Sequence, residues 1–377
     1  MPVLIAAGIR SPFTHVEGAL AGWHPVDLTA AILRQAVETA ETDTDRIDEV
    51  FVGCAEPVGA QGADMARAAV LAAGWPDRIG GVVVDRAESS GSAALHLACA
   101  AIESGELERA VVVGTCVASV VSPGASALAR TYGRPWGDGP AARVEDEGGL
   151  LPAAVAADRA ASIAGIGRID QDAWATGSHD RRGLAQSSAI RPVEARPGGR
   201  VAIQRGTPVT FDDPRPLPPD AATLPPSFDP DGAVTGFTFA PPIDGVTALV
   251  LAAAGSAQDT PAIIGRARSA GHPLDPTGGA SSAIDQALKR AGVTRDDIGR
   301  WEVAETTAAA ALFVCEHAQL DRTRVNINGG TLGVGDGGAA EELRLIVDGA
   351  AHAESGELVA AVAYGPSGAA ATIMRCP

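Results

Sequence analysis

A carboxylate occupies a position in this sequence at which many enzymes place a nucleophile. Residues 82–102, VVVDRAESSGSAALHLACAAI, run from three β-branched residues through a Ser-Ser-Gly turn into apolar residues at helical spacing. This pattern predicts a strand that leads into a helix, whose unpaired N–H groups and dipole stabilise an anion at its start. The residue at the bend is Glu88. It is expected either to act as a base that faces a substrate or to cap the helix.

The cysteines and histidines form no recognisable metal or disulfide pattern. The five cysteines are widely spaced and include no CxxC pair, which argues against a disulfide scaffold and against a zinc site. No two histidines have the spacing of metal ligands on one helix face. We therefore expect no bound metal, and we expect His96 to be buried within the helix that follows Glu88.

The composition argues against several classes of protein. The chain has 377 residues, is 46% hydrophobic and carries a formal net charge of −17. An acidic chain without clustered basic residues is a poor partner for nucleic acid or for an anionic membrane. No stretch is long and apolar enough to span a membrane, and the N-terminus MPVLIAAGIRSPF has no basic leader. A cytoplasmic protein is expected.

The sequence contains an internal repeat. Residues 103–114, ESGELERAVVVG, match residues 354–365, ESGELVAAVAYG, and Gln35 aligns with Gln286 at the same offset of 251 residues. Each copy alternates helices with continuously apolar strands, which predicts sheets with parallel strands that are covered by helices. The protein is therefore expected to contain two copies of one α/β unit.

The segment between the two copies differs from them in composition, because it is rich in Arg, Pro, Gly and Asp. Such a segment predicts an excursion over the surface with helices of its own. We predict that residues 1–122 and 231–256 form the first half, residues 123–230 form an inserted loop domain, and residues 257–377 form the second half.

In chain order, the motifs of this sequence resemble those of the thiolase superfamily. The matching segments cover nearly the whole chain and include GIRSPF, VDRAESSGSAALHLACAAIESGE, VVVGTCVASVVSP, DGAVTGFTFAPPIDGVTALVL, VNINGGTLGVGDGGAAEELR and AVAYGPSGAAATIMR. The resemblance implies a five-layered α-β-α-β-α fold, with two duplicated halves and a loop domain inserted in the first. It makes residues 82–103 and 326–354 equivalent strand-turn-helix units, with both helices side by side at the centre. It also implies acyl-CoA thioesters as substrates or ligands, no metal or redox cofactor, and dimers or tetramers.

The resemblance fails at the catalytic residues. The position of the nucleophilic Cys aligns with Glu88, and the Asn-Glu-Ala-Phe segment reads Ala-Glu-Thr-Thr here, which keeps only Glu305. The Gly-His pair is replaced by a Gly-Asp pair that ends at Asp336, and the position of the second Cys falls within residues 362–364, VAY. These changes remove a nucleophile, a base, an acid and an oxyanion donor. A Cys-dependent Claisen condensation or thiolysis is therefore not expected.

The remaining groups define a candidate catalytic set. The family fold would bring Asp336 and Tyr364 to the same pocket as Glu88, and Glu305 survives from the family motif. Asp, Glu and Tyr side chains differ in proton affinity, as general acid and base catalysis requires. Each also has a structural interpretation: Asp336 as a turn residue in GVGDGG, and Tyr364 as a packed strand residue.

Candidates for binding coenzyme A come from the inserted segment. The stretch TGSHDRR matches a family region beside the pantetheine channel and contains Ser178, His179 and Arg182. A guanidinium group matches phosphate well, although a solvated face is the alternative for any of these arginines. The further arginine candidates for phosphate binding are Arg130, Arg134, Arg143 and Arg181.

Two functions remain open. The first is a Cys-independent carbon–carbon bond enzyme that acts on an acyl-CoA or another acyl thioester, by retro-aldol cleavage or by decarboxylation. Tyr364 is compatible with it, since thiolase-like aldolases use Tyr. The second is a non-catalytic subunit that pairs with an active thiolase or with a small acyl-CoA-binding protein. A homodimer is also expected, with the strand at residues 109–114 close to its seam.

Overall fold

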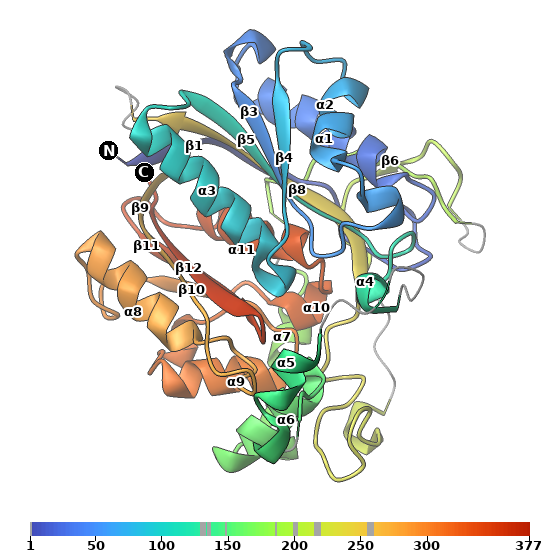
Figure 1. Ribbon diagram of the computed structural model, residues 1–377, viewed down its shortest axis with the longest axis vertical. Coiled ribbons are helices and arrows are strands. Elements are labelled where there is room, and N and C mark those ends of the chain that lie inside the picture. The colour runs from blue at the N-terminus through green and yellow to red at the C-terminus, as the bar shows by residue number, and fades with distance from the viewer. Residues whose placement is uncertain are drawn as a thin grey trace.

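Two α/β halves and a largely helical insertion make up the protein (Figure 1). The computed structural model describes residues 2–128, 133, 137–147, 149–184, 187–198, 203–214, 220–254 and 260–377. Within these residues, no helix combines the length and the apolar character that crossing a membrane requires.

The first half forms one side of a mixed sheet. Its strands are β1 (Val3–Arg10), β2 (Thr14–His15), β3 (Glu49–Gly53), β4 (Gly80–Val84), β5 (Arg109–Val117) and β8 (Ile243–Ala253). β3 pairs in parallel with β4 and β5, whereas β8 pairs antiparallel with β5 and β1. The resulting order is β4-β3-β5-β8-β1, and the short β2 pairs with β8.

The second half repeats this arrangement. Its strands are β9 (Ala262–Ser269), β10 (Arg300–Val303), β11 (Leu358–Gly365) and β12 (Gly368–Arg375). β10 is parallel to β11, and β12 is antiparallel to β11 and β9, so the order β10-β11-β12-β9 reproduces β3-β5-β8-β1. The repeat in the sequence is thus a repeat in topology. The strand expected at the start of residues 326–354 is instead a single bridge between Val325 and Trp301.

Helices cover both faces of this continuous sheet, whose halves join where β1 pairs with β9. Alternate residues of β5 face two cores: Val112 packs in the core of the central helices, while Val111 and Val113 pack in the core of the outer helices. The two central helices, one from each half, contact each other between the two halves of the sheet (Figure 1). The predicted five-layered α/β fold is confirmed. The helices are α1 (Pro25–Thr39) and α2 (Met65–Ala72) outside the first half, α3 (Ser90–Ser104) and α11 (Ala339–Ala351) at the centre, and α8 (Ala280–Ala291) and α9 (Ala308–His317) outside the second half.

The insertion lies against the second half. Its elements are α4 (Ala125–Leu128), α5 (Asp138–Ala142), α6 (Ala153–Ile163), α7 (Arg168–Asp180), β6 (Val193–Glu194) and β7 (Pro208–Val209). α6 and α7 both contact α9, and α7 also contacts the short α10 (Thr331–Val334). α10 leads into α11. The insertion therefore reaches the loop that precedes the second central helix.

The starts of the two central helices are held together by direct backbone packing. A Cβ added at Gly91 of α3, or at Gly114 of β5, would overlap the carbonyl oxygen of Ala339, the first residue of α11. Only glycine permits such close approach of two backbones. The two helix N-termini, one from each half, consequently meet at one place, and the candidate residues next to them share a site.

The strand β5 lies in the interior of the sheet. It is paired along its length with β3 on one side and β8 on the other. Its backbone is therefore unavailable to a partner, and the expectation that residues 109–114 lie close to a homodimer seam stays a prediction. The edge of this half of the sheet is β4.

Candidate active site

Glu88 lies in a tight bend between β4 and α3. The bend is a single 3-10 turn, Ala87–Ser89, and Ala87 adopts the left-handed backbone conformation with φ 45°. This conformation is uncommon for a residue with a side chain and costs free energy. The Glu88 side chain is exposed and lies over Gly365 at the end of β11, where an added Cβ would come within 2.6 Å of Glu88 Cβ. Glu88 therefore lies at the junction of the two halves.

The start of α3 is capped by a carboxylate that the sequence reading did not single out. The backbone N–H of Ser92 donates to Glu342 Oε2 of α11 at 2.8 Å. By contrast, no hydrogen bond to the Glu88 carboxylate is present within the described residues. The capping interpretation of Glu88 is thus not supported, and Glu342 has that role. The signal in the sequence was a pair of adjacent Glu residues within the otherwise apolar start of a helix, AAEELRLIV.

Asp336 is held at the start of α11 by its own backbone. Its N–H donates to the carbonyl of Pro241 at 2.8 Å, and its carbonyl accepts from Ile243 at 3.1 Å. One carboxylate oxygen accepts from the N–H of Gly338 at 2.8 Å. Burial raises the pKa of Asp336 to about 6, the Gly338 N–H opposes this shift, and the charges of Glu341 and Glu88 add to it.

Glu342 has an even more strongly raised pKa. Its side chain is buried, and burial raises its pKa to about 8, with a smaller contribution from the charge of Asp336. Glu342 Oε1 has no hydrogen-bond partner among the described residues. At neutral pH the group is consequently a neutral carboxylic acid that can still form one hydrogen bond.

Glu305 is a structural hub. Glu305 is fully buried, and its carboxylate accepts four hydrogen bonds at 2.7–3.1 Å. Trp174 Nε1 and Ser178 Oγ donate from the insertion. Asn326 Nδ2 and the N–H of Leu332 donate from the second half. These donors satisfy both oxygens of the buried carboxylate. Glu305 therefore ties α7 to the second half.

Tyr364 is also engaged within the protein. It is buried on β11, and its hydroxyl donates to the carbonyl of Ala304 at 2.6 Å. Burial raises its pKa well above the ordinary value, and the nearby charges of Glu305 and Asp336 raise it further. The hydroxyl thus stays protonated near neutral pH, and its geometry agrees with the packed strand residue that was the alternative interpretation.

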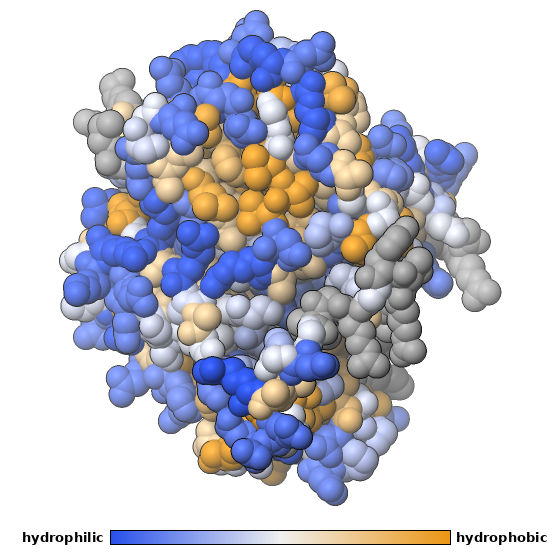
Figure 2. Space-filling view, viewed as in Figure 1, coloured by the Kyte–Doolittle hydropathy of each residue, from blue (hydrophilic) through white to orange (hydrophobic). Residues whose placement is uncertain are grey.

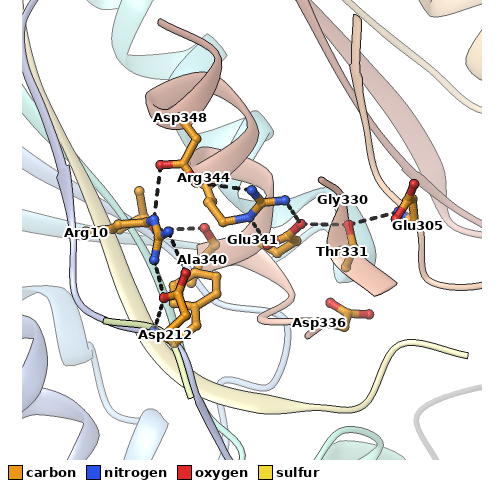
Figure 3. A network of polar contacts seen from close by, with 12 residues as sticks. Arg10, Asp212, Glu305, Gly330, Thr331, Asp336, Ala340, Glu341, Arg344 and Asp348 are labelled. Atoms are coloured by element: carbon orange, nitrogen blue, oxygen red, sulfur yellow. Dashed lines mark hydrogen bonds and ion pairs between the residues drawn. The ribbon is translucent and has the colours of Figure 1, made fainter. Parts of the chain in front are cut away.

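A buried network of ion pairs surrounds the start of α11, the second central helix (Figure 3). Arg344 of α11 pairs with Glu341 at 2.6 Å and with Asp348 at 3.1 Å, and Asp348 also pairs with Arg10 of β1 at 3.1 Å. Thr331 Oγ1 donates to Glu341 at 2.6 Å and accepts from the N–H of Glu305 at 3.0 Å. Buried charges must be paired in this way to persist. The network joins β1, α10 and α11 and so anchors the loop that carries Asp336.

The coenzyme A candidates are placed in different surroundings. The buried Ser178 hydroxyl donates to Glu305. The His179 ring stacks on Phe237 with centroids 4.8 Å apart, and burial lowers its pKa, so it is neutral at pH 7. Arg182 is exposed and borders a cavity of about 370 Å³, which Gly183, Asp212, Asp213, Pro214, Gly333 and Val334 also line.

The remaining arginine candidates contribute less. Arg143 is exposed after α5, and Arg181 packs its guanidinium against Gly177 of α7. Arg130 and Arg134 lie outside the described residues. Of the arginine candidates that the structure describes, Arg182 is the one that borders the cavity.

The thiols and the histidine next to the bend are not poised for nucleophilic or base chemistry. Burial raises the pKa of Cys54 and Cys376 to about 11, that of Cys99 and Cys315 to about 12, and that of Cys116 well above the usual value. Such thiols are not ionised near neutral pH. His96 contacts Thr372 Oγ1 at 2.8 Å, and burial strongly lowers its pKa. The described residues contain no cluster of side chains that could hold a metal ion.

Comparisons with known proteins identify the family. The thiolase N-terminal domain matches residues 3–255, and the thiolase C-terminal domain matches residues 257–375. An acetyl-CoA acetyltransferase of Pseudomonas aeruginosa is 31% identical over 92% of this chain and 91% of its own length. A beta-ketoadipyl-CoA thiolase of Pseudomonas putida is 31% identical over 88% of each chain.

Solved structures agree over the full length. The Acat5 thiolase of Ascaris suum, solved in complex with coenzyme A, has a TM-score of 0.86 at 23% identity and covers 100% of both chains. The acetyl-CoA acetyltransferase of Bacillus anthracis has a TM-score of 0.83 at 26% identity, over 100% of this chain and 99% of its own. The fold, the repeat and the matches over both domains agree, and the chain therefore belongs to the thiolase family.

Proposed function

We propose that this protein binds an acyl-CoA thioester where its two halves meet and acts on it without a cysteine nucleophile. The ligand is supported by the relatives named for acetyl-CoA chemistry and by the coenzyme A complex of a structural neighbour. The absence of a covalent step through cysteine is supported by Glu88 at the bend before α3 and by the raised pKa values of all five thiols.

The observation that carries the proposed chemistry is the close packing of Gly91 against Ala339, which brings together the loops that hold Glu88 and Asp336. They come from different halves, and the charge of Glu88 contributes to the raised pKa of Asp336. Two carboxyl groups that face one substrate can act as a base and an acid on it. Breaking a carbon–carbon bond next to the thioester carbonyl needs these two functions, together with a place for the enolate that forms.

In retro-aldol cleavage of a 3-hydroxyacyl-CoA, the Glu88 carboxylate accepts the proton of the 3-hydroxyl. The C2–C3 bond breaks, its electron pair passes to the enolate, and a carbonyl compound leaves. Protonated Asp336 then gives its proton to C2, and acyl-CoA is released. In decarboxylation, carbon dioxide leaves instead and Asp336 again protonates C2. Because Asp336 acts in its protonated form, turnover falls as the pH rises above about 6.

A second candidate function is a non-catalytic subunit. Glu305 and Tyr364, half of the candidate catalytic set, are engaged in hydrogen bonds within the protein. A subunit of this kind would bind an acyl-CoA or support an active thiolase or a small acyl-CoA-binding protein without turnover. It predicts that Glu88 can be replaced without loss of the partner's activity.

The test is incubation with a panel of acyl-CoA and 3-hydroxyacyl-CoA thioesters, followed by mass spectrometry of the protein and chromatography of the products. The proposal expects products without an acyl adduct on cysteine, and loss of product in Glu88→Gln and Asp336→Asn. Glu106→Gln, at an exposed acid beyond the other end of α3, is the control that keeps activity. A stable adduct that disappears in a Cys→Ser variant together with turnover would contradict the proposal. No product with any thioester favours the non-catalytic subunit.

We also propose a homodimer that forms along β4. This strand is the edge of its half-sheet, and Val82 at its middle is 40% exposed. Figure 2 shows a hydrophobic area at the centre of this face, over the region where Figure 1 places β4 and α3. An exposed apolar edge strand is a template for pairing with another chain. Sedimentation is expected to give about twice the 37.9 kDa of one chain, and Val82→Lys is expected to give the monomer. A wild-type monomer at micromolar concentration would contradict this.

A further inference from the structure

Three carboxyl groups lie at the meeting point of the two central helices. Glu88 lies exposed at the bend, three residues before Gly91, and Asp336 lies three residues before Ala339, whose carbonyl oxygen packs against Gly91. Glu342 lies between α3 and α11. The charges that act on the pKa of Asp336 are those of Glu341 and Glu88, and the charge that acts on Glu342 is that of Asp336. All of these charges are negative.

The nearest arginines are engaged elsewhere. Arg86, two residues before Glu88, donates to the carbonyls of Ser269 and Ala369 and to the hydroxyl of Ser89. Arg344 of α11 is paired with two buried carboxylates. The charge of Arg344 is therefore balanced within the protein. Arg86 keeps its charge, because its partners are neutral, but its N–H groups are directed at the protein.

The helix terminus that could otherwise attract an anion is already occupied. The N-terminus of a helix binds carboxylates and phosphates through its free N–H groups. Here Glu342 Oε2 accepts from the N–H of Ser92 in the first turn of α3 at 2.8 Å, and Glu342 is only 3% exposed. Its Oε1 atom is buried and has no hydrogen-bond partner among the described residues. The carboxyl group of Glu342 therefore occupies the position at the start of α3 where an anion could otherwise bind.

We propose that this site accepts CoA thioesters whose acyl group is uncharged and rejects those whose acyl group carries a carboxylate, with Glu88 and Asp336 as the residues that discriminate. The inference rests on the proposed acyl-CoA function. A second negative charge close to these two would be repelled in a partly desolvated site, and repulsion of this kind is an effective source of specificity. We call this discrimination against acyl carboxylates the charge filter. Of the two reaction classes above, the filter favours retro-aldol cleavage, because a decarboxylation substrate would place its own carboxylate next to Glu88 and Asp336.

The experiment compares butyryl-CoA with succinyl-CoA, which have the same number of acyl carbons and differ by a terminal carboxylate. Dissociation constants are measured by calorimetry at pH 7.5 with the full chain. Succinyl-CoA is expected to bind at least about tenfold more weakly than butyryl-CoA, which corresponds to about 1.4 kcal/mol. In Glu88→Gln/Asp336→Asn the ratio of the two constants is expected to fall to within about twofold. The control Glu106→Gln keeps the wild-type ratio.

Each outcome decides the inference. Equal affinity of the two thioesters for the wild-type protein overturns it, whatever the variants do. A wild-type ratio that persists in the double variant, and in each folded single variant, overturns the assignment to Glu88 and Asp336. Binding of free CoA without binding of butyryl-CoA overturns the filter and leaves a CoA site. Binding of none of the three overturns the proposed acyl-CoA function together with the filter.

Discussion

The two junctions that lead into the central helices occupy equivalent places in the repeat but differ in how they hold their carboxylate. At the first, Glu88 projects from a strained bend, and no hydrogen bond to its carboxylate is present in the described part of the chain. At the second, backbone hydrogen bonds to Pro241 and Ile243 hold Asp336, which also accepts from Gly338. The duplicated backbone thus presents one solvent-facing acid and one anchored, desolvated acid.

The difference extends into the helices behind the junctions. The first two turns of α3 contain only small or apolar residues and a histidine, SGSAALH. α11 instead carries Glu341, Glu342 and Arg344 in the corresponding stretch, all buried. A side chain of α11, Glu342, caps the start of α3. α11 is instead stabilised by an ion pair within itself, between Arg344 and Glu341. We therefore expect perturbations of α11 to affect stability most, and perturbations of the first junction to affect function most.

The largest expected effect is that of Arg344→Met. It leaves the buried carboxylates of Glu341 and Asp348 without their shared cation, and removal of one partner from a buried ion pair costs about 3–5 kcal/mol. Arg322→Gln is the matched control, because Arg322 pairs with Glu316 on the surface of the same half, where a pair contributes about 0–1 kcal/mol. Denaturant unfolding measures both. Equal losses in the two variants would show that the second junction does not depend on its ion pairs.

The next effect concerns Glu342 and depends on pH. Burial raises its pKa from 4.5 to about 8 in the folded protein, so between these pH values the folded state binds a proton that the unfolded state lacks. Stability from this group is therefore lost as the pH rises from about 4.5 to 8, by up to about 1.4 kcal/mol per pH unit. Glu342→Gln, which mimics the neutral acid, is expected to exceed wild type in stability by a margin that grows from pH 5 to pH 8. Parallel curves of melting temperature against pH would refute the neutral state of Glu342.

A smaller effect is expected from Gly365→Ala at the first junction. An added Cβ would lie 2.6 Å from Glu88 Cβ, and overpacking of this kind costs about 1–3 kcal/mol. Gly236→Ala is the control, since no atom lies within 4 Å of a Cβ at that position. Combining Gly365→Ala with Glu88→Gly is expected to recover part of the loss. Additive losses in the double variant would show that Glu88 does not lie over Gly365.

The fold could be predicted from the sequence because its evidence is repeated along the chain. The repeat of residues 103–114 at residues 354–365 corresponds to β5 and β11, which occupy equivalent places in the strand order. The interior position of β5 could not be predicted, since pairing with β8 joins residues more than a hundred positions apart. The division into residues 1–122 with 231–256, 123–230 and 257–377 stays a prediction.

The candidate site could be predicted only as a set of positions. Motif order placed Glu88 and Asp336, but hydrogen-bond partners depend on contacts between distant segments. Tyr364 donates to Ala304, and Glu305 accepts from two residues of the insertion, which no local pattern reveals. Glu342 was missed for the same reason, because its role as a cap arises only where α11 crosses the start of α3. The catalytic and binding assignments stay predictions.

The smallest expected effect on stability is that of Glu88→Ala, and it tests the comparison most directly. If the carboxylate capped α3, its loss would cost about 1 kcal/mol. Because Ser92 donates to Glu342 instead, and Glu88 is exposed, we expect a change within about 0.5 kcal/mol. Glu342→Ala, measured at pH 6 in the same unfolding series, is expected to lose more than Glu88→Ala, since it removes the actual cap and opens a cavity. If Glu88→Ala abolishes turnover while its unfolding midpoint stays at the wild-type value, the exposed junction has a catalytic role. A loss of about 1 kcal/mol in Glu88→Ala, with turnover unchanged, would instead make Glu88 a second cap and leave Asp336 without a partner.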